Sequence, residues 1–365
     1  MEETEALESG ATLPDTAPLH ELLAVEPLEL EIGYALVPLV GEKEEGDLLQ
    51  RIGIMRKQLA LELGMVIPPT RIRDNVQLSA NEYVIKLRGI RVASGELMPR
   101  HLLALDMNGL GASVEGVPTR DPSFGMQAVW ITAEQRAEAE ANGLTVVDAR
   151  TVLATHLMES IRNHAAELLS RQSVRELLDG LKETHPALVE DVVPNRVSLG
   201  TVHRVLQRLL RERVPIRDLV TILEALSDAA ETTKDPEALT ETVRRALSLV
   251  IVQSLGATGT SLRGITVGPR LELAMMQLFS PRSQEGAKPP EPGQLTTALG
   301  ELGRIVKSTK QDGSPTPLVT PPALRVGIRR LIEPTYPQLP VVSIAELPAQ
   351  TPVQTVAVWE LPDAA

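Results

Sequence analysis

Six histidines are the side chains that could most readily bind a metal ion or transfer a proton. Their spacing includes neither an HExxH pattern nor a tight cluster with carboxylates, so the sequence predicts no metal site. His156 and His164 lie eight residues apart on one expected helix, with Glu159 to one side. That spacing is compatible with a metal pair, but it is more typical of packed or capping histidines. The six are His20, His101, His156, His164, His185 and His203.

Patterns for nucleophiles and phosphate loops are also missing. The chain has no cysteine, which excludes thiol catalysis and disulfides, and no serine lies in a GxSxG elbow. Gly109-Leu110-Gly111 follows an expected strand, but Val114 stands in place of the third glycine of a dinucleotide fingerprint. Residues 256–264 lack the GKS or GKT ending of a phosphate-binding loop. We therefore expect no enzyme activity and no cofactor.

The charge balance is acidic, because 48 Asp and Glu against 36 Lys and Arg give a net charge of −12. Nucleic-acid binding normally needs clustered positive charge. The strongest basic patch follows one expected helix, but Glu212 and Asp218 dilute it, so we predict a solvated helix face there. The patch consists of Arg204, Arg208, Arg211 and Arg213.

Length and composition indicate several globular domains. With 365 residues, of which 43% are hydrophobic, the chain is long enough for two or three domains with their own cores. No apolar stretch approaches the roughly 18 residues that a membrane-spanning helix needs. The sequence therefore predicts a soluble, multidomain protein.

The N-terminal region is predicted to be a flexible linker over residues 1–26, followed by a strand. Apolar residues alternate from Leu28 to Leu36, which is typical of a half-buried strand. Gly33 lies inside this pattern and predicts a bulge or a close approach of another backbone segment. The linker has a small apolar cluster at helical spacing, formed by Leu19, Leu22 and Leu23.

Periodicity predicts three regions beyond this strand. Strands alternate with short helices through residue 148, which indicates an α+β region. Helical spacing predicts an all-helical region over 169–250, in which Ser173 and Glu176 cap one helix and Asp235-Pro236 opens another. Strands and helices alternate again over 251–365, which predicts a small α/β unit.

Several segments are specific enough to compare with known families. They are 28–34, 46–52, 56–64, 68–75, 121–125 (Asp-Pro-Ser-Phe-Gly), 151–157, 214–219 and 322–325. In this order, and over about residues 20–350, they resemble the cytoplasmic region of the flagellar export-gate membrane proteins, of the FHIPEP family of type III secretion export proteins. Family members also carry a multi-span membrane domain, which this sequence does not include, so we expect the chain to be soluble alone.

The resemblance implies an α+β multidomain fold of four subdomains, with the second inserted in the first. The third is all-helical and the fourth is a small α/β unit. The expected boundaries are 1–26 for the linker, 27–99 with 149–168 for the first subdomain, 100–148 for the second, 169–250 for the third and 251–365 for the fourth.

The function that the resemblance implies is a docking platform at the cytoplasmic face of the bacterial inner membrane. The platform would bind flagellar export chaperones that carry late substrates, contact other export-apparatus proteins and switch the substrate class. It would form a homo-oligomeric ring, usually nine-membered. Neither covalent chemistry nor nucleic-acid binding is implied.

Three alternatives stay open. One is the equivalent component of a virulence injectisome, although the segment 121–125 and the Thr155-His156 pair are more similar to flagellar proteins. Another is a small-molecule enzyme, which would need convergent titratable groups in a pocket. The third is a purely structural ring component that contacts no substrate.

The resemblance also implies a binding site for chaperone–substrate complexes. The matching family positions line a hydrophobic dimple and fall on Asp121, Phe124, Val147 and Thr155. Phe124 and Val147 would supply apolar contact area, while Asp121 and Thr155 would orient the partner. A competing interpretation makes Phe124 a core anchor that pins its loop, because large apolar residues are usually buried.

Two further roles are implied in the same way. The family glycine that matches Gly33 affects movement between subdomains, so Gly33 is a candidate hinge. The linker of a neighbouring subunit, through Leu19, Leu22 and Leu23, could compete for the dimple.

Overall fold

The computed structural model describes residues 25–40, 48–107, 114–256, 261–279, 291–309 and 316–361. The linker residues Leu19, Leu22 and Leu23 lie outside the described residues. Within these ranges, no helix combines the length and the apolar character that crossing a membrane requires.

The first sheet has the strand order β2-β1-β3-β4 and contributes one face to the large core. β1 pairs parallel with β2 and antiparallel with β3, and β3 pairs antiparallel with β4. The amphipathic helices α2 and α4 pack against it, and Gly64 ends α2 with a left-handed φ of 79°. The bounds are β1 (Leu28–Ile32), η1 (Tyr34–Leu39), α2 (Leu48–Leu63), β2 (Arg71–Asp74), β3 (Glu82–Leu87), β4 (Ile90–Glu96) and α4 (Ala149–Asn163).

An inserted sheet, entirely antiparallel, lies between β4 and α4 in the sequence and has the order β6-β7-β5-β8. One of its faces joins the large core through Leu103, Leu105 and Trp130, and the other covers a small core of its own beneath α3. β8 passes directly into α4, whose N-cap is Asp148. The bounds are β5 (Leu102–Leu105), β6 (Val117–Arg120), β7 (Gln127–Ile131), η2 (Ala133–Gln135), α3 (Arg136–Ala141) and β8 (Thr145–Asp148).

A helical segment follows, in which every described element is a helix. Side-chain N-caps at Ser170, Ser198, Asp218 and Asp235 start α6, α8, α9 and α10, so the predicted start at Asp235 is confirmed and the predicted cap at Ser173 is wrong. The bounds are α5 (Ala165–Leu168), α6 (Arg171–Lys182), α7 (Pro186–Glu190), η3 (Asp191–Arg196), α8 (Leu199–Arg211), α9 (Leu219–Ala229), α10 (Pro236–Ala246) and α11 (Ser248–Ser254).

The C-terminal sheet is entirely parallel, with the order β11-β10-β9-β12. Its outer face has a separate core, in which the buried Trp359 indole donates to the Ala298 carbonyl at 2.7 Å. Its inner face meets the large core through Leu262, Val319 and Val342. The bounds are β9 (Leu262–Val267), α12 (Pro269–Phe279), α13 (Pro292–Thr309), β10 (Leu318–Thr320), α14 (Arg325–Ile332), β11 (Val341–Ser343), η4 (Ile344–Glu346) and β12 (Val353–Trp359).

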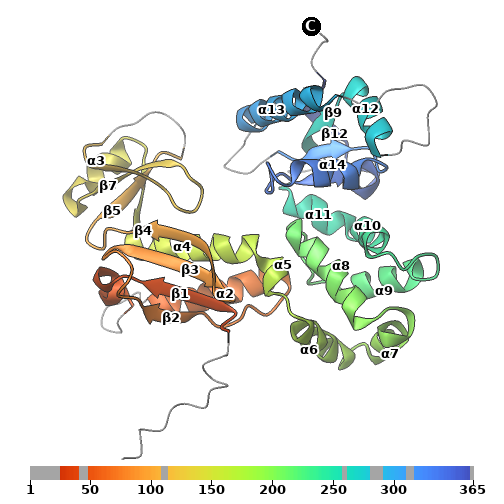
Figure 1. Cartoon of the computed structure of the whole chain (residues 1–365), viewed down its shortest axis with the longest axis horizontal. Helices are drawn as coiled ribbons and strands as arrows, with labels where there is room; N and C mark the ends of the chain where they lie inside the picture. The colour runs from red at the N-terminus through yellow and green to blue at the C-terminus, as the bar shows by residue number, and fades with distance from the viewer. Residues whose placement is uncertain are drawn as a thin grey trace, which may run out of the picture.

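These parts surround the centre of the molecule (Figure 1). The first sheet lies at the lower left of the view, the inserted sheet above it, the helical segment at the lower right and the C-terminal sheet above that. The predicted mixed fold, with strands at both ends and helices between them, is confirmed. The division into four subdomains, with its boundaries, stays a prediction.

The strand predicted through Leu36 is wrong, because β1 ends at Ile32 and η1 follows. Gly33 turns the chain: its N–H donates to the Glu82 carbonyl at 2.8 Å, and its own carbonyl accepts from Leu36 at 3.0 Å. A Cβ at Gly33 would lie 2.1 Å from the Ser79 carbonyl oxygen. The predicted close backbone approach is therefore confirmed, and it explains why the position requires glycine.

Candidate functional site

The loop between β6 and β7 presents one exposed aromatic ring. Asp121, which is only 5% exposed, accepts a hydrogen bond from the Phe124 N–H at 2.7 Å. The Asp121 N–H donates to the Met126 carbonyl, and Gly125 closes the turn with a left-handed φ of 69°. The loop is thus fixed from within, and Phe124 stands 59% exposed. That exposure argues against the interpretation of Phe124 as a core anchor.

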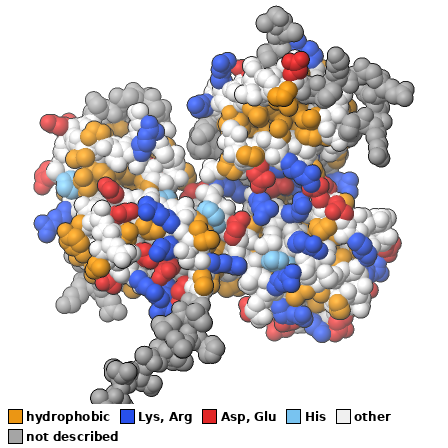
Figure 2. All heavy atoms as spheres, in the orientation of Figure 1, with side chains coloured by type: hydrophobic (Ala, Val, Ile, Leu, Met, Phe, Trp, Pro, Cys, Tyr) orange, Lys and Arg blue, Asp and Glu red, His pale blue; other side chains and the backbone are white. Residues whose placement is uncertain are grey.

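Phe124 lines a cleft of about 660 Å³. Figure 2 shows the hollow between the inserted sheet and the C-terminal sheet. The opposite wall is residues 337–342, which form the loop before β11 and the start of that strand, and the turn that follows α8 contributes residues 212–215. Glu159 and Arg162 of α4 line it as well. The cleft thus collects residues from every major part of the chain.

The other three predicted site residues, Asp121, Val147 and Thr155, are not among the described residues that line this cleft. Thr155 is partly buried on α4, four residues before Glu159 and therefore on the same helix face. Val147 lies on β8, partly buried against the large core. The structure thus brings Asp121 and Phe124 into one loop, and it places Thr155 on the helix that borders the cleft.

A buried polar pair links the first sheet to α4. The Tyr83 hydroxyl lies 2.7 Å from His156 Nδ1, and the two rings meet edge to face. Burial raises the pKa of Tyr83, and the negative charge of Asp121 adds to this, so the hydroxyl stays protonated and donates to Nδ1. Burial also lowers the pKa of His156. His156 is therefore a neutral, packed histidine.

The second histidine of α4 caps the helix. His164 Nδ1 lies 2.9 Å from the Ser160 carbonyl and donates to it at the end of α4. The packed and capping interpretation of His156 and His164 is therefore confirmed. Among the described residues, no group of three or more histidine, aspartate or glutamate side chains could hold a metal ion.

The cleft is bordered by charged side chains that we call the α4 cluster: Glu62, Glu159, Arg162 and Arg213. Glu159 accepts from Arg162 at 2.6 Å and from Arg213 at 2.5 Å. Arg162 also donates two hydrogen bonds to Glu62. These bonds raise the pKa of Arg162 and outweigh burial, which alone would lower that pKa. The cluster ties α2, α4 and the end of α8 together.

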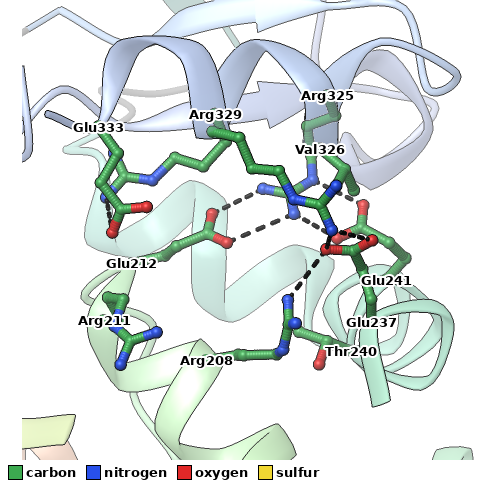
Figure 3. Close-up of a pocket in the computed structure, with 11 residues that line it drawn as sticks. Arg208, Arg211, Glu212, Glu237, Thr240, Glu241, Arg325, Val326, Arg329 and Glu333 are labelled. Carbon is green, nitrogen blue, oxygen red and sulfur yellow. Dashed lines mark hydrogen bonds and ion pairs between the residues drawn. The ribbon is translucent and has the colours of Figure 1, made fainter. Parts of the chain in front are cut away.

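A second cluster lies where the C-terminal sheet meets the helical segment (Figure 3). Arg244 and Glu346, 2% and 1% exposed, form two hydrogen bonds at 2.8 and 2.9 Å. Arg325 donates to Glu212 at 2.6 Å and also to Glu241. We call this set, with Arg329, the joint cluster. Its three arginines and three glutamates balance in charge.

Glu212 shows why the joint cluster is stable as a charged group. Burial alone would raise its pKa, but Arg244 and Arg325 together outweigh burial, so the pKa lies below its ordinary value. The neighbouring cavity measures only about 60 Å³, and the carboxylates that line it already bind its arginines. The joint cluster therefore serves to connect the C-terminal sheet with the helical segment.

The basic helix face is solvated in part, because Arg204 and Arg211 are exposed, as predicted. Arg208, Arg211 and Arg213 each face a carboxylate on another element, at 3.1, 3.8 and 2.5 Å. These partners come from sequence positions far from α8, so no local pattern in the sequence indicates them. The face is therefore partly solvated and also forms ion pairs with other elements, which the prediction did not include.

Comparison with known sequences gives one family. The model of the FHIPEP family matches residues 1–352. The chain is 40% identical over 349 residues to "Flagellar biosynthesis protein FlhA" of Bacillus subtilis, which covers 93% of this chain and 50% of that protein. The chain thus spans about half the length of the curated relatives that it matches.

Solved structures share the fold. The Chlamydia pneumoniae CdsV protein, in its complex with CdsO, is 24% identical, with a TM-score of 0.81 over 94% of this chain and 99% of the CdsV chain. Nonameric SctV-C of EPEC is 21% identical, with a TM-score of 0.73 over 94% of this chain and all of that one. The arrangement of sheets and helices described above is therefore a known one.

Proposed function

Because the chain belongs to the FHIPEP family, we propose that it is the cytoplasmic docking platform of a flagellar type III protein export gate. In this role it receives export chaperones that carry late substrates and switches the substrate class. The 40% identity to a protein named for flagellar biosynthesis supports the flagellar assignment over the injectisome alternative.

The observation that carries the docking role is the exposure of Phe124. The ring is 59% exposed on a loop that its own hydrogen bonds hold, at the edge of a large cleft, so it offers apolar contact area to a partner. Aromatic side chains of this kind supply much of the binding energy in protein interfaces. The Asp121 carboxylate accepts the Phe124 N–H and so fixes the backbone that carries the ring.

Calorimetric titration with purified export chaperone–filament protein complexes tests this proposal. We expect Phe124→Ala to weaken binding by about 1–3 kcal/mol, the usual range for an interface hot spot. The matched control is Ile90→Ala, which removes another exposed apolar side chain, 70% exposed on β4. The proposal is wrong if Phe124→Ala binds as tightly as the parent, or if Ile90→Ala weakens binding equally.

Ring assembly at the cytoplasmic face of the inner membrane belongs to the same proposal. A nonameric relative with this fold supports it. Subunits that are not held on a membrane lose effective concentration, so we expect weak ring contacts and mainly monomers in dilute solution. Sedimentation velocity at micromolar concentration measures this, and a stable nonamer would contradict the expectation.

A further inference from the structure

Arg213 has a backbone conformation that normally selects glycine. It follows α8 with a φ of 58°, where its N–H donates to the Leu210 carbonyl and the Val214 N–H donates to the Leu209 carbonyl. Helices commonly end in this way, and glycine is the usual residue because it has no Cβ. A bulky residue held there points to a role for its side chain.

The Arg213 side chain reaches α4. Its guanidinium donates to Glu159 at 2.5 Å and also to Asn163. Glu159 is only 5% exposed, and both Arg213 and Glu159 line the cleft that Phe124 borders. The strained position therefore ties the end of α8 to the helix that carries Thr155.

The neighbours of Arg213 fix the same turn to other parts of the chain. Glu212 binds Arg325 of α14 at 2.6 Å. The Ile216 N–H donates to the Leu63 carbonyl at the end of α2 at 2.9 Å. Within five residues, the chain thus contacts the C-terminal sheet region, α4 and α2. A change at this turn would alter the spacing of the cleft walls.

We propose that Arg213 is a positioning residue for the docking cleft: its ion pair with Glu159 holds α4 and the α8 end at the spacing that partner binding requires. This inference rests on the proposed function, because it takes the cleft at Phe124 as the docking site. Glu159 keeps Arg162 as a second partner, so loss of Arg213 leaves no unpaired buried charge.

The substitution Arg213→Gly separates this role from a purely structural one. Glycine suits the left-handed backbone, so we expect the melting temperature to stay close to that of the parent. We expect affinity for chaperone–filament protein complexes to fall about three- to tenfold, a size typical of residues that couple distant sites. Arg213→Lys keeps the charge and should restore at least part of the affinity.

The matched control is Arg88→Gly. Arg88 also has a left-handed φ, 48°, and it lies in the turn between β3 and β4, where it does not line the cleft. The same exchange there should leave affinity unchanged. If Arg213→Gly and Arg88→Gly both bind like the parent while Phe124→Ala binds weakly, the inference fails and the docking proposal stands.

A distance measurement gives a readout that needs no partner. Because the chain has no cysteine, Gln127→Cys with Gln338→Cys places spin labels on the inserted sheet and on the far cleft wall without competing sites. We expect Arg213→Gly to broaden or shift this distance distribution and Arg88→Gly to leave it unchanged. Identical distributions in all three proteins would overturn the inference, whatever the outcome for docking.

Discussion

The two junctions of the molecule use different chemistry. The inserted sheet meets α4 and the first sheet mainly through apolar side chains such as Leu103, Leu105 and Trp130. The C-terminal sheet meets the helical segment through apolar contacts and also through the buried ion pairs of the joint cluster. The contacts of the inserted sheet therefore have no preferred direction, whereas the ion pairs of the joint cluster fix the geometry at the C-terminal sheet.

This difference predicts different mechanical behaviour. Apolar packing depends on buried area and tolerates small shifts, because it has no preferred direction. Buried ion pairs lose much of their energy when a partner moves, since each charge then remains desolvated. We therefore expect the inserted sheet to move more readily than the C-terminal sheet. Four predictions test this contrast, from the largest expected effect to the smallest.

Glu346→Gln should be the most destabilising of these changes. It removes a carboxylate that pairs with Arg244 and lies 3.4 Å from Arg325, both nearly fully buried. Breaking a buried pair typically costs about 3–5 kcal/mol. Chemical denaturation measures the loss. The control, Glu301→Gln, breaks an exposed pair with Arg304 and should cost less than about 1 kcal/mol. Equal losses would show that the joint cluster contributes no special stability.

Gly33→Cys should have the second largest effect. Its Cβ would lie 2.1 Å from the Ser79 carbonyl oxygen, so the turn at residues 79–80 must shift. Crowding of this kind costs about 1–3 kcal/mol. In a chimeric export gate, we expect normal motility in the cold and impaired motility when warmed, consistent with a hinge at Gly33.

The control for this prediction is Gly53→Cys in α2, where a Cβ would meet no atom within 4 Å. We expect its melting temperature and motility to match the parent. Gly33→Cys with a parental melting temperature would show that the turn adapts without cost.

His156 should give a smaller, pH-dependent effect where the first sheet packs against α4. Burial holds its pKa below the ordinary 6.5, so the unfolded chain binds a proton before the folded one does. Its contribution to stability is present above pH 6.5 and is lost as pH falls through the lower, folded pKa. We expect thermal scans from pH 7.5 to 5.5 to show a steeper decline for the parent than for His156→Asn. Parallel curves would contradict this assignment.

Phe124→Ala should have the smallest effect on stability. The ring is 59% exposed and its loop is held by hydrogen bonds of Asp121, so we expect a change within about 0.5 kcal/mol. Denaturant titration measures it. A large loss would mean that the ring supports the fold of the inserted sheet.

Local signals in the sequence predicted much of the fold. The helix start at Asp235 was predicted because an N-cap acts within a few residues. The glycine that ends α2 and the capping box of Thr132 with Gln135 are local signals of the same kind, and the structure contains each of them. β4 carries no such signal, because most of its side chains are exposed or half-buried and it has no apolar alternation.

The site was predictable only in part. Pro122 and Gly125 indicate a turn, but nothing in the sequence decides whether Phe124 points into a core or into solvent. The ion pairs of the charge clusters could not be predicted from the sequence, for another reason. Arg325 pairs with Glu241 and Glu212, which precede it by 84 and 113 residues, and no local pattern connects them. Only the fold brings such partners together.

The direct passage of β8 into α4 has a mechanical consequence. Asp148 ends the strand and caps the helix, and Arg51 of α2 donates to both Asp148 and Thr151 at this point. No flexible linker separates strand and helix, so a movement of β8 is passed on to α4, and Arg51 contacts both elements where the strand becomes the helix. A partner that tilts the inserted sheet would apply torque to α4, and Glu159, one helical turn before the C-terminal end of α4, is the point where Arg213 opposes that movement.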